Sequence, residues 1–179
     1  MMRQNTLAVF VIAVGMMSLV PTAMADDVVE VRKFDSEPEI VWEAWTDVEL
    51  ISQWWGPTGF TAPKVEVNVE IGSATLVCMQ GPGSPLMCNT WTYSVVEPGR
   101  ELAFDSRFTA EDETPMTATD AGLPPGIPDV VPHRVTFEPD PDGGTIMTVT
   151  ETGYLSAEAA ALSKQGLLQV LDKMQALVP

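Results

Sequence analysis

The sequence predicts one α+β domain in which a group of strands stands between two short helices and one long helix. Residues 26–179 have the length of a single domain. Apolar and polar residues alternate in several stretches of the middle of the chain, whereas helical spacing of apolar residues is found near residues 38–55 and 156–178. Strands that are grouped between helices, rather than alternating with them, indicate an α+β fold rather than a parallel βαβ fold.

The first strand and the two short helices are expected before residue 56. Alternation predicts a strand over residues 27–34. Ser36 followed by Glu39 matches a capping box, which predicts that a short helix starts there. Asp47 is expected to cap a second short helix, which Gly56 and Pro57 end. The apolar stripe of the two helices comprises Val41, Trp42, Ala44, Trp45, Leu50, Ile51, Trp54 and Trp55.

About six further strands and the long helix are expected after residue 60. Alternation predicts a strand over residues 65–71, and a Gly/Pro-rich loop at 81–85 separates strands at 74–80 and 87–96. Further strands are expected at 102–108, 133–138 and 145–151. Residues 110–132 contain five prolines and are expected to be irregular. A helix is expected from Ser156 onward, because Leu167, Met174 and Leu177 recur at helical spacing.

The first residues have the composition of an export signal. Arg3 precedes an apolar run of 14 residues from Leu7 to Val20, and Ala23-Met24-Ala25 forms a small-residue cleavage box. Residues 1–25 are therefore interpreted as a signal peptide, which makes residues 26–179 a periplasmic or secreted domain. An uncleaved anchor or a buried helix is the alternative. The apolar run is shorter than the roughly 20 residues that a membrane span needs. No stable membrane insertion is therefore expected after cleavage.

The charge of the chain disfavours polyanionic partners. The formal net charge is −16, from 25 acidic and 9 basic residues. Such a surface repels nucleic-acid backbones and anionic lipids, so no nucleic acid is expected as a partner. A solvated surface that aids solubility explains the acidity, and a cationic partner is the alternative.

The two cysteines are candidates for a disulfide. Cys78 and Cys88 lie symmetrically about Gly83, so in a symmetric hairpin they face each other across the two strands. Exported thiols tend to pair, and two free thiols are the alternative. A single histidine, His133, does not provide a histidine-based metal site. No nucleophile elbow, phosphate-binding loop or calcium-loop spacing is present, so no cofactor, metal or catalytic residue is expected.

Two motifs carry a family resemblance. These are Val41-Trp42-x-Ala44-Trp45-Thr46-Asp47 and Trp54-Trp55-Gly56-Pro57-x-Gly59-Phe60. They resemble the N-terminal signature of the START-like (SRPBCC) proteins of the family of activator of 90-kDa heat-shock-protein ATPase homologue 1-like proteins, and the likeness covers residues 28–178. The resemblance implies a helix-grip fold, in which a curved antiparallel sheet wraps around the long C-terminal helix and encloses an apolar cavity.

The chain departs from this family at several positions. Family members often carry Trp where this chain has Leu167, which implies a larger or reshaped cavity. The resemblance also implies stimulation of a cytosolic chaperone ATPase, but export separates the protein from that partner.

A ligand cavity between the sheet and the last helix is the candidate site. Trp54 and Trp55 are adjacent and face different ways, so one is expected in the core and one at the cavity mouth; the alternative is that both pack in the core. Residues 110–132 are a candidate lid. A filled core is the alternative to a cavity. The expected lining comprises Trp54, Trp55, Phe60, Phe104, Phe108, Met147, Val149, Leu167, Leu171 and Met174.

Three functions are compatible with the sequence. The first is binding of a small hydrophobic molecule, the second is an enzyme of the cyclase or lyase kind, and the third is a pocketless interaction module. His133 is interpreted as a hydrogen-bonded or surface residue rather than a general base. A buried His133 or carboxylate that faces a cavity would favour the enzyme, a dry apolar cavity would favour binding, and a packed interior would favour the interaction module.

Overall fold

The computed structural model describes residues 27–178, and the proposed signal peptide at residues 1–25 lies outside them. All neighbouring strands are antiparallel, in the order β1-β7-β6-β5-β4-β3-β2. The strands are β1 (Val28–Phe34), β2 (Thr61–Glu66), β3 (Ala74–Gln80), β4 (Met87–Glu97), β5 (Glu101–Thr109), β6 (Val130–Pro139) and β7 (Thr145–Glu151).

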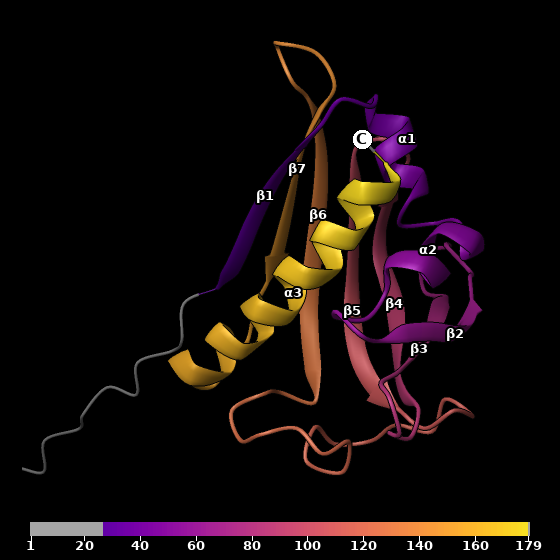
Figure 1. The fold of residues 1–179 in the computed structure, drawn as a ribbon, viewed down its shortest axis with the longest axis vertical. Helices are drawn as coiled ribbons and strands as arrows, with labels where there is room; N and C mark the ends of the chain where they lie inside the picture. The colour runs from indigo at the N-terminus through magenta and orange to yellow at the C-terminus, as the bar shows by residue number, and fades with distance from the viewer. Residues whose placement is uncertain (1–26, 179) are drawn as a thin grey trace, which may run out of the picture.

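Among residues 27–178 three helices accompany the sheet, and the long one crosses a single face of the curved sheet (Figure 1). They are α1 (Pro38–Glu43), α2 (Val48–Trp54) and α3 (Ala157–Leu177). Seven antiparallel strands against one long helix, with two short helices after the first strand, confirm the predicted α+β helix-grip architecture.

Helix caps agree with the sequence at two of the three helix starts. The Asp47 carboxylate accepts hydrogen bonds from the backbone N–H groups of Glu49 and Leu50, both at 2.9 Å. Ser156 caps α3 by accepting from the backbone of Ala159 at 3.1 Å. The predicted cap at Ser36 is wrong: Glu37 occupies the N-cap position of α1 without a side-chain cap. Pro38 then takes the first helical position, which its fixed φ suits.

The strand predicted at 65–71 is also displaced. The structure places β2 at Thr61–Glu66, with a register shift between Thr61 and Lys64. Beyond it, the backbone N–H of Asn68 donates to the Thr75 hydroxyl at 3.1 Å instead of to a strand neighbour. A side chain therefore satisfies the backbone where the alternation of valines suggested a continuing ladder.

The core is dominated by aromatic rings packed under α1 and α2. Trp45, Trp54 and Trp91 are fully buried, and the Trp45 and Trp54 ring centroids lie 4.9 Å apart in an edge-to-face arrangement. The Trp54 ring N–H donates to the backbone oxygen of Ala44 at 2.7 Å, which fixes the ring. This end of the space between sheet and helix is filled.

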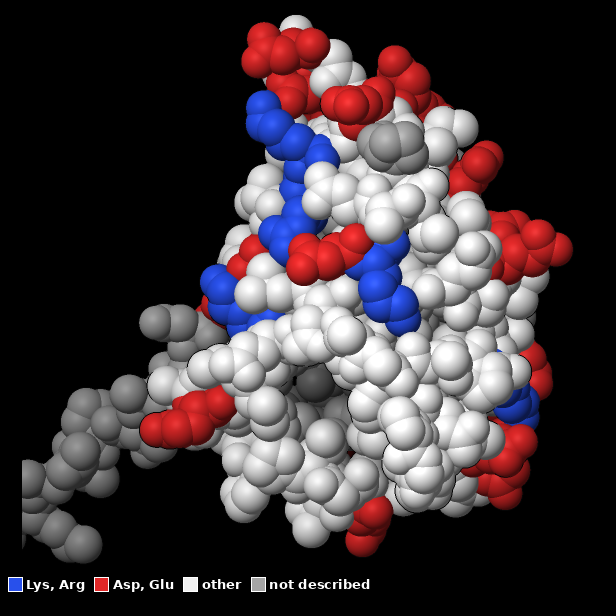
Figure 2. Space-filling view, in the orientation of Figure 1, with Lys and Arg blue, Asp and Glu red and all other residues white. Residues whose placement is uncertain are grey.

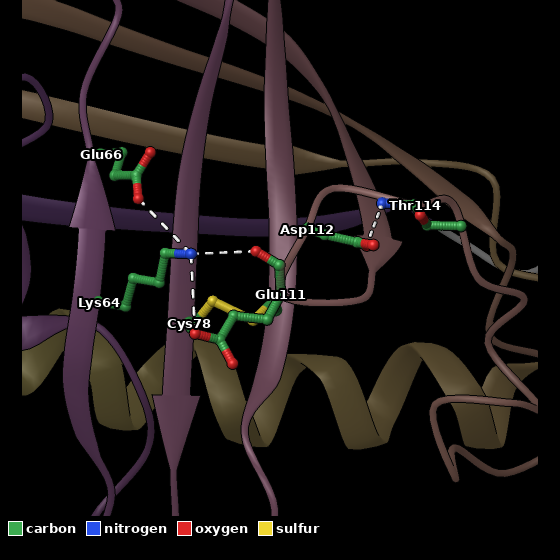
Figure 3. Close-up of a disulfide and its surroundings, with 7 residues drawn as sticks. Lys64, Glu66, Cys78, Glu111, Asp112 and Thr114 are labelled. Atoms are coloured by element: carbon green, nitrogen blue, oxygen red, sulfur yellow. Dashed lines mark hydrogen bonds and ion pairs between the residues drawn. A yellow bond between two sulfur atoms is a disulfide. The ribbon is translucent and has the colours of Figure 1, made fainter.

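The β3–β4 hairpin has the predicted register, and its two cysteines face each other. Cys78 pairs with Cys88 across the strands, and their sulfur atoms are joined in a disulfide. Beside it, the Lys64 ammonium donates to the backbone oxygen of Glu111 at 3.0 Å and lies 3.5 Å from the Glu66 carboxylate (Figure 3). Lys64 thus ties the segment after β5 to the sheet on the disulfide side.

Candidate ligand cavity

An open cavity of about 400 Å³ lies between the inner face of the sheet and residues 162–170 of α3. Its apolar walls come from Met79, Met87 and Val131 on the strands, Leu162 and Val170 on α3, and Leu123 and Ile127 on the segment after β5. Figure 2 shows the same face hollowed beside α3, with uncharged residues around the opening. The volume is of the size that takes a small organic ligand.

Three of the residues predicted to line the cavity do so. They are Trp55 after α2, Phe108 on β5 and Leu167 on α3. Trp54 lies in the core and its neighbour Trp55 at the cavity, as their adjacency suggested.

The other seven predicted lining residues lie elsewhere. Phe60 packs outside the cavity, against the backbone of Gly56 and Gly81. The physical reason for the rest is that α3 packs into the buried core from Leu171 onward, whereas its residues between 162 and 170 leave space above the sheet. The buried core, rather than the cavity, therefore contains Trp54, Phe104, Met147, Val149, Leu171 and Met174.

The segment predicted as a lid contributes to the wall. Leu123 and Ile127 line the cavity, and the backbone oxygen of Gly126 accepts from Leu155 at 2.9 Å, next to the start of α3. The segment between β5 and β6 thus closes one side of the space that the sheet and α3 leave open.

One end of the cavity is polar, and sequence reasoning missed this feature. His133 on β6 pairs directly with Glu151 on β7 across the sheet. The His133 Nε2 atom lies 3.3 Å from a Glu151 carboxylate oxygen, and His133 Nδ1 lies 2.8 Å from the backbone oxygen of Val131. A lone histidine at a strand start is interpreted as a surface or hydrogen-bonded residue. His133 is hydrogen-bonded and not on the surface: its side chain is 11% exposed, and its ring stacks on Phe104 with 4.9 Å between the ring centroids.

Both ring nitrogens of His133 face hydrogen-bond acceptors. A carbonyl oxygen only accepts, so Nδ1 carries a proton toward Val131. The ionised Glu151 carboxylate also only accepts, so its contact with Nε2 is a hydrogen bond when Nε2 is protonated as well. At the cavity wall, Nδ1 of His133 thus faces the Val131 carbonyl and Nε2 faces the Glu151 carboxylate.

Tyr154 and Ser163 complete the surroundings of Glu151. The Tyr154 hydroxyl lies 2.5 Å and the Ser163 hydroxyl 2.8 Å from the second carboxylate oxygen. Burial raises the pKa of Glu151, but the hydrogen bonds and charge of His133, together with Tyr154 and Ser163, outweigh it and leave the pKa lowered. Burial and the Glu151 charge raise the pKa of Tyr154, which keeps its proton and acts as a donor.

Two further polar residues lie on the same inner face. Asn89 on β4 stands opposite Phe108, and Ser106 on β5 stands opposite Trp91 and Val131. Both line the cavity, with exposed fractions of 5% and 6%. Strand parity was the available signal: Asn89 follows a cysteine of the hairpin, so it faces away from the disulfide.

Among the described residues that line the cavity there is neither a lysine nor an arginine. Among residues 27–178 no cluster of three metal-ligating side chains occurs. Within the same range, no helix has the length and apolar character needed to cross a bilayer.

A family model described as Activator of Hsp90 ATPase homolog 1-like protein matches residues 35–179. This chain belongs to that family. A comparison with curated proteins finds no match. Solved structures of AHSA1-like proteins share the fold. The AHSA1 protein from Silicibacter pomeroyi is 17% identical, with a TM-score of 0.68, over 85% of this chain and 96% of its own.

Two other solved structures are similar over most of their length. A protein from Chromobacterium violaceum is 23% identical with a TM-score of 0.69, over 85% of this chain and 96% of its own. A protein from Mycobacterium smegmatis is 25% identical with a TM-score of 0.67, over 86% and 90%. The AHSA1-like fold supports a general hydrophobic-ligand-binding domain.

Proposed function

We propose that this AHSA1-like protein is an exported binding protein for a small hydrophobic molecule. The observation that carries the proposal is the cavity of about 400 Å³, which is walled by aromatic, methionine and aliphatic side chains. Burial of apolar ligand surface in such a space is favourable by about 25 cal/mol per Å². Methionines such as Met79 and Met87 suit a wall that adapts to ligand shape. The open cavity argues against a pocketless interaction module.

Export is the second part of the proposal. It is supported by the charged start, apolar run and cleavage box of residues 1–25. The Cys78–Cys88 disulfide suits an oxidising compartment such as the periplasm. A periplasmic or secreted protein does not meet a cytosolic chaperone, so no chaperone partner is proposed.

Binding is tested by filling the cavity from α3. Gly166 lines the cavity, and a Cβ atom built on it meets no atom within 4 Å. Gly166→Phe should therefore place a ring in the ligand space, whereas Gly166→Ala adds one methyl and favours the helix. The neutral fluorescent probe N-phenyl-α-naphthylamine is expected to bind the wild type and Gly166→Ala, and to bind Gly166→Phe at least tenfold more weakly. Equal binding by all three proteins, or none by the wild type, would contradict the proposal.

A second candidate is an enzyme of the cyclase or lyase kind, favoured by the His133–Glu151 pair. Nε2 of His133 and the Glu151 carboxylate lie 3.3 Å apart at the cavity wall, where they are placed to exchange a proton with a bound carbonyl compound by general acid–base catalysis. Ligands that bind are incubated with the protein, and products are followed by mass spectrometry. Turnover that is lost in His133→Gln while binding persists would establish the enzyme. Binding without turnover would support the binding protein rather than the enzyme.

A further inference from the structure

We propose that the cavity selects a ligand with one neutral hydrogen-bonding group, such as a hydroxyl, carbonyl or amide, and that Asn89 and Ser106 hold that group. The inference rests on the proposed binding function and specifies the chemistry of its ligand. It starts from two polar side chains that are more than nine-tenths buried, line the cavity and are engaged by none of the side-chain hydrogen bonds described above.

The two side chains are placed to act together. Asn89 pairs with Phe108, which lies two positions from Ser106 on the same face of β5. Asn89 and Ser106 are therefore diagonal neighbours, at a spacing of about 7–8 Å between such positions. One polar atom of a ligand fits between a carboxamide and a hydroxyl at this spacing. The amide both donates and accepts, and so does the hydroxyl.

The rest of the sheet leaves these two groups free for a ligand. By contrast, the Tyr93 hydroxyl donates to Thr75 at 3.1 Å, and Glu151 accepts from Tyr154 and Ser163. The ring N–H groups of Trp55 and Trp91 are also buried without a partner. A buried polar group without a partner costs free energy. A ligand that forms a hydrogen bond with these groups should therefore bind more tightly than a hydrocarbon of the same shape, which forms none.

The charges at the cavity make the expected group neutral. Glu151 is negative and lines the cavity, neither lysine nor arginine lines it, and both ring nitrogens of His133 already face Val131 and Glu151. A ligand carboxylate would meet the Glu151 charge in a medium of low dielectric constant, with no free cation to pair with it. Long-chain and aromatic carboxylates are therefore disfavoured relative to the alcohols and ketones of the same skeleton.

The test compares ligands that share one ring system. Naphthalene, α-naphthol and α-naphthoate compete with N-phenyl-α-naphthylamine for the wild type, for Asn89→Leu and for Ser106→Ala. Thr90→Val is the matched control, because Thr90 is buried on the same strand as Asn89 but faces the opposite side of the sheet. Thermal unfolding establishes that each variant is folded.

The wild type is expected to bind α-naphthol more tightly than naphthalene, and to bind α-naphthoate at least tenfold more weakly than α-naphthol at neutral pH. Asn89→Leu and Ser106→Ala should each lower the affinity for α-naphthol by about threefold to tenfold. Naphthalene should change by less than about twofold, and Thr90→Val should change neither ligand. The inference is overturned if the ratio of the affinities for α-naphthol and naphthalene is unchanged in both variants, or if α-naphthoate binds as tightly as α-naphthol. Either result leaves the proposed binding function standing. If the wild type binds neither N-phenyl-α-naphthylamine nor naphthalene, both the inference and the proposed function are overturned.

Discussion

At Glu151, two opposing effects act on one buried carboxyl group. Burial disfavours its charge, whereas His133, Tyr154 and Ser163 stabilise it, and the net effect is a lowered pKa. The residue is 5% exposed and receives its partners from β6, from the segment after β7 and from α3. One carboxylate therefore links the sheet to the helix at the polar end of the cavity.

Glu151→Gln is expected to destabilise the protein and to flatten its acid sensitivity. A folded-state pKa below the ordinary value of 4.5 means that the carboxylate stabilises the fold above about pH 4.5, and that this contribution is lost as the pH falls through the folded-state pKa. Breaking the buried pair should lower the free energy of unfolding by about 3 kcal/mol at neutral pH. Urea unfolding is measured from neutral pH to about pH 3.

The matched control is Glu138→Gln, because Glu138 is an exposed carboxylate on the outer end of β6. It should change the free energy of unfolding by less than about 0.5 kcal/mol. If wild type and Glu151→Gln lose stability equally below about pH 4.5, the Glu151 carboxylate does not contribute as described.

At the scale of the elements, the sequence was sufficient for the architecture and insufficient for the cavity. Alternation, turns and caps located the strands and helices of the described residues, apart from the shift of β2, the start of α1 and the start of β6, which begins at Val130 rather than at residue 133. The division of α3 was not visible, because Leu167, Leu171 and Met174 lie on the same apolar stripe. Which of them meets the core and which meets open space depends on how far the helix stands from the sheet along its length.

The polar end of the cavity illustrates the same limit. Strand parity places Asn89 and Ser106 on the inner face, but it does not show whether they meet other polar groups. His133 and Glu151 are adjacent because the register of β6 and β7 places these two residues directly opposite each other. A shift by two residues would keep every side chain on its face and separate the pair.

The disulfide belongs to the β3–β4 hairpin and lies on the opposite face of the sheet from Asn89. Replacing both Cys78 and Cys88 with Ala should lower the free energy of unfolding by at most about 3 kcal/mol, because the loop closed by a separation of 10 residues is short. Binding of the fluorescent probe should persist, since the cavity wall uses the neighbouring residues Met79, Met87 and Asn89. Urea unfolding and probe titration measure the two effects.

Thiol titration provides the direct check on that bridge. Protein denatured without reductant should give no reactive thiol, and the same protein after reduction should give two, because Cys78 and Cys88 are the two cysteines of the chain. Two thiols before reduction would show that the bridge does not form.

At the scale of the whole molecule, the charged outer surface and the opening of the cavity are separated. The chain has a formal net charge of −16, yet the opening that Figure 2 shows beside α3 is bordered by uncharged residues. The acidic surface keeps the protein soluble, while the uncharged rim lets an apolar ligand reach the cavity without passing a charged group. This arrangement suits a protein that collects a poorly soluble molecule from water.

Such a role outside the cytosol depends on export, and the mature protein is predicted to begin at Asp26. The apolar run from Leu7 to Val20 is shorter than the roughly 20 residues of a membrane span, and Ala23-Met24-Ala25 supplies the small residues that signal peptidases require. Removal of residues 1–25 takes away Arg3 and moves the formal net charge from −16 to −17. Intact-mass measurement of protein recovered from the periplasm or medium is expected to match residues 26–179, less two hydrogen atoms for the disulfide. Replacing Ala23 and Ala25 with bulky residues should block cleavage and keep the chain at the membrane. Recovery of the exported chain with residues 1–25 retained would instead identify the segment as an uncleaved anchor.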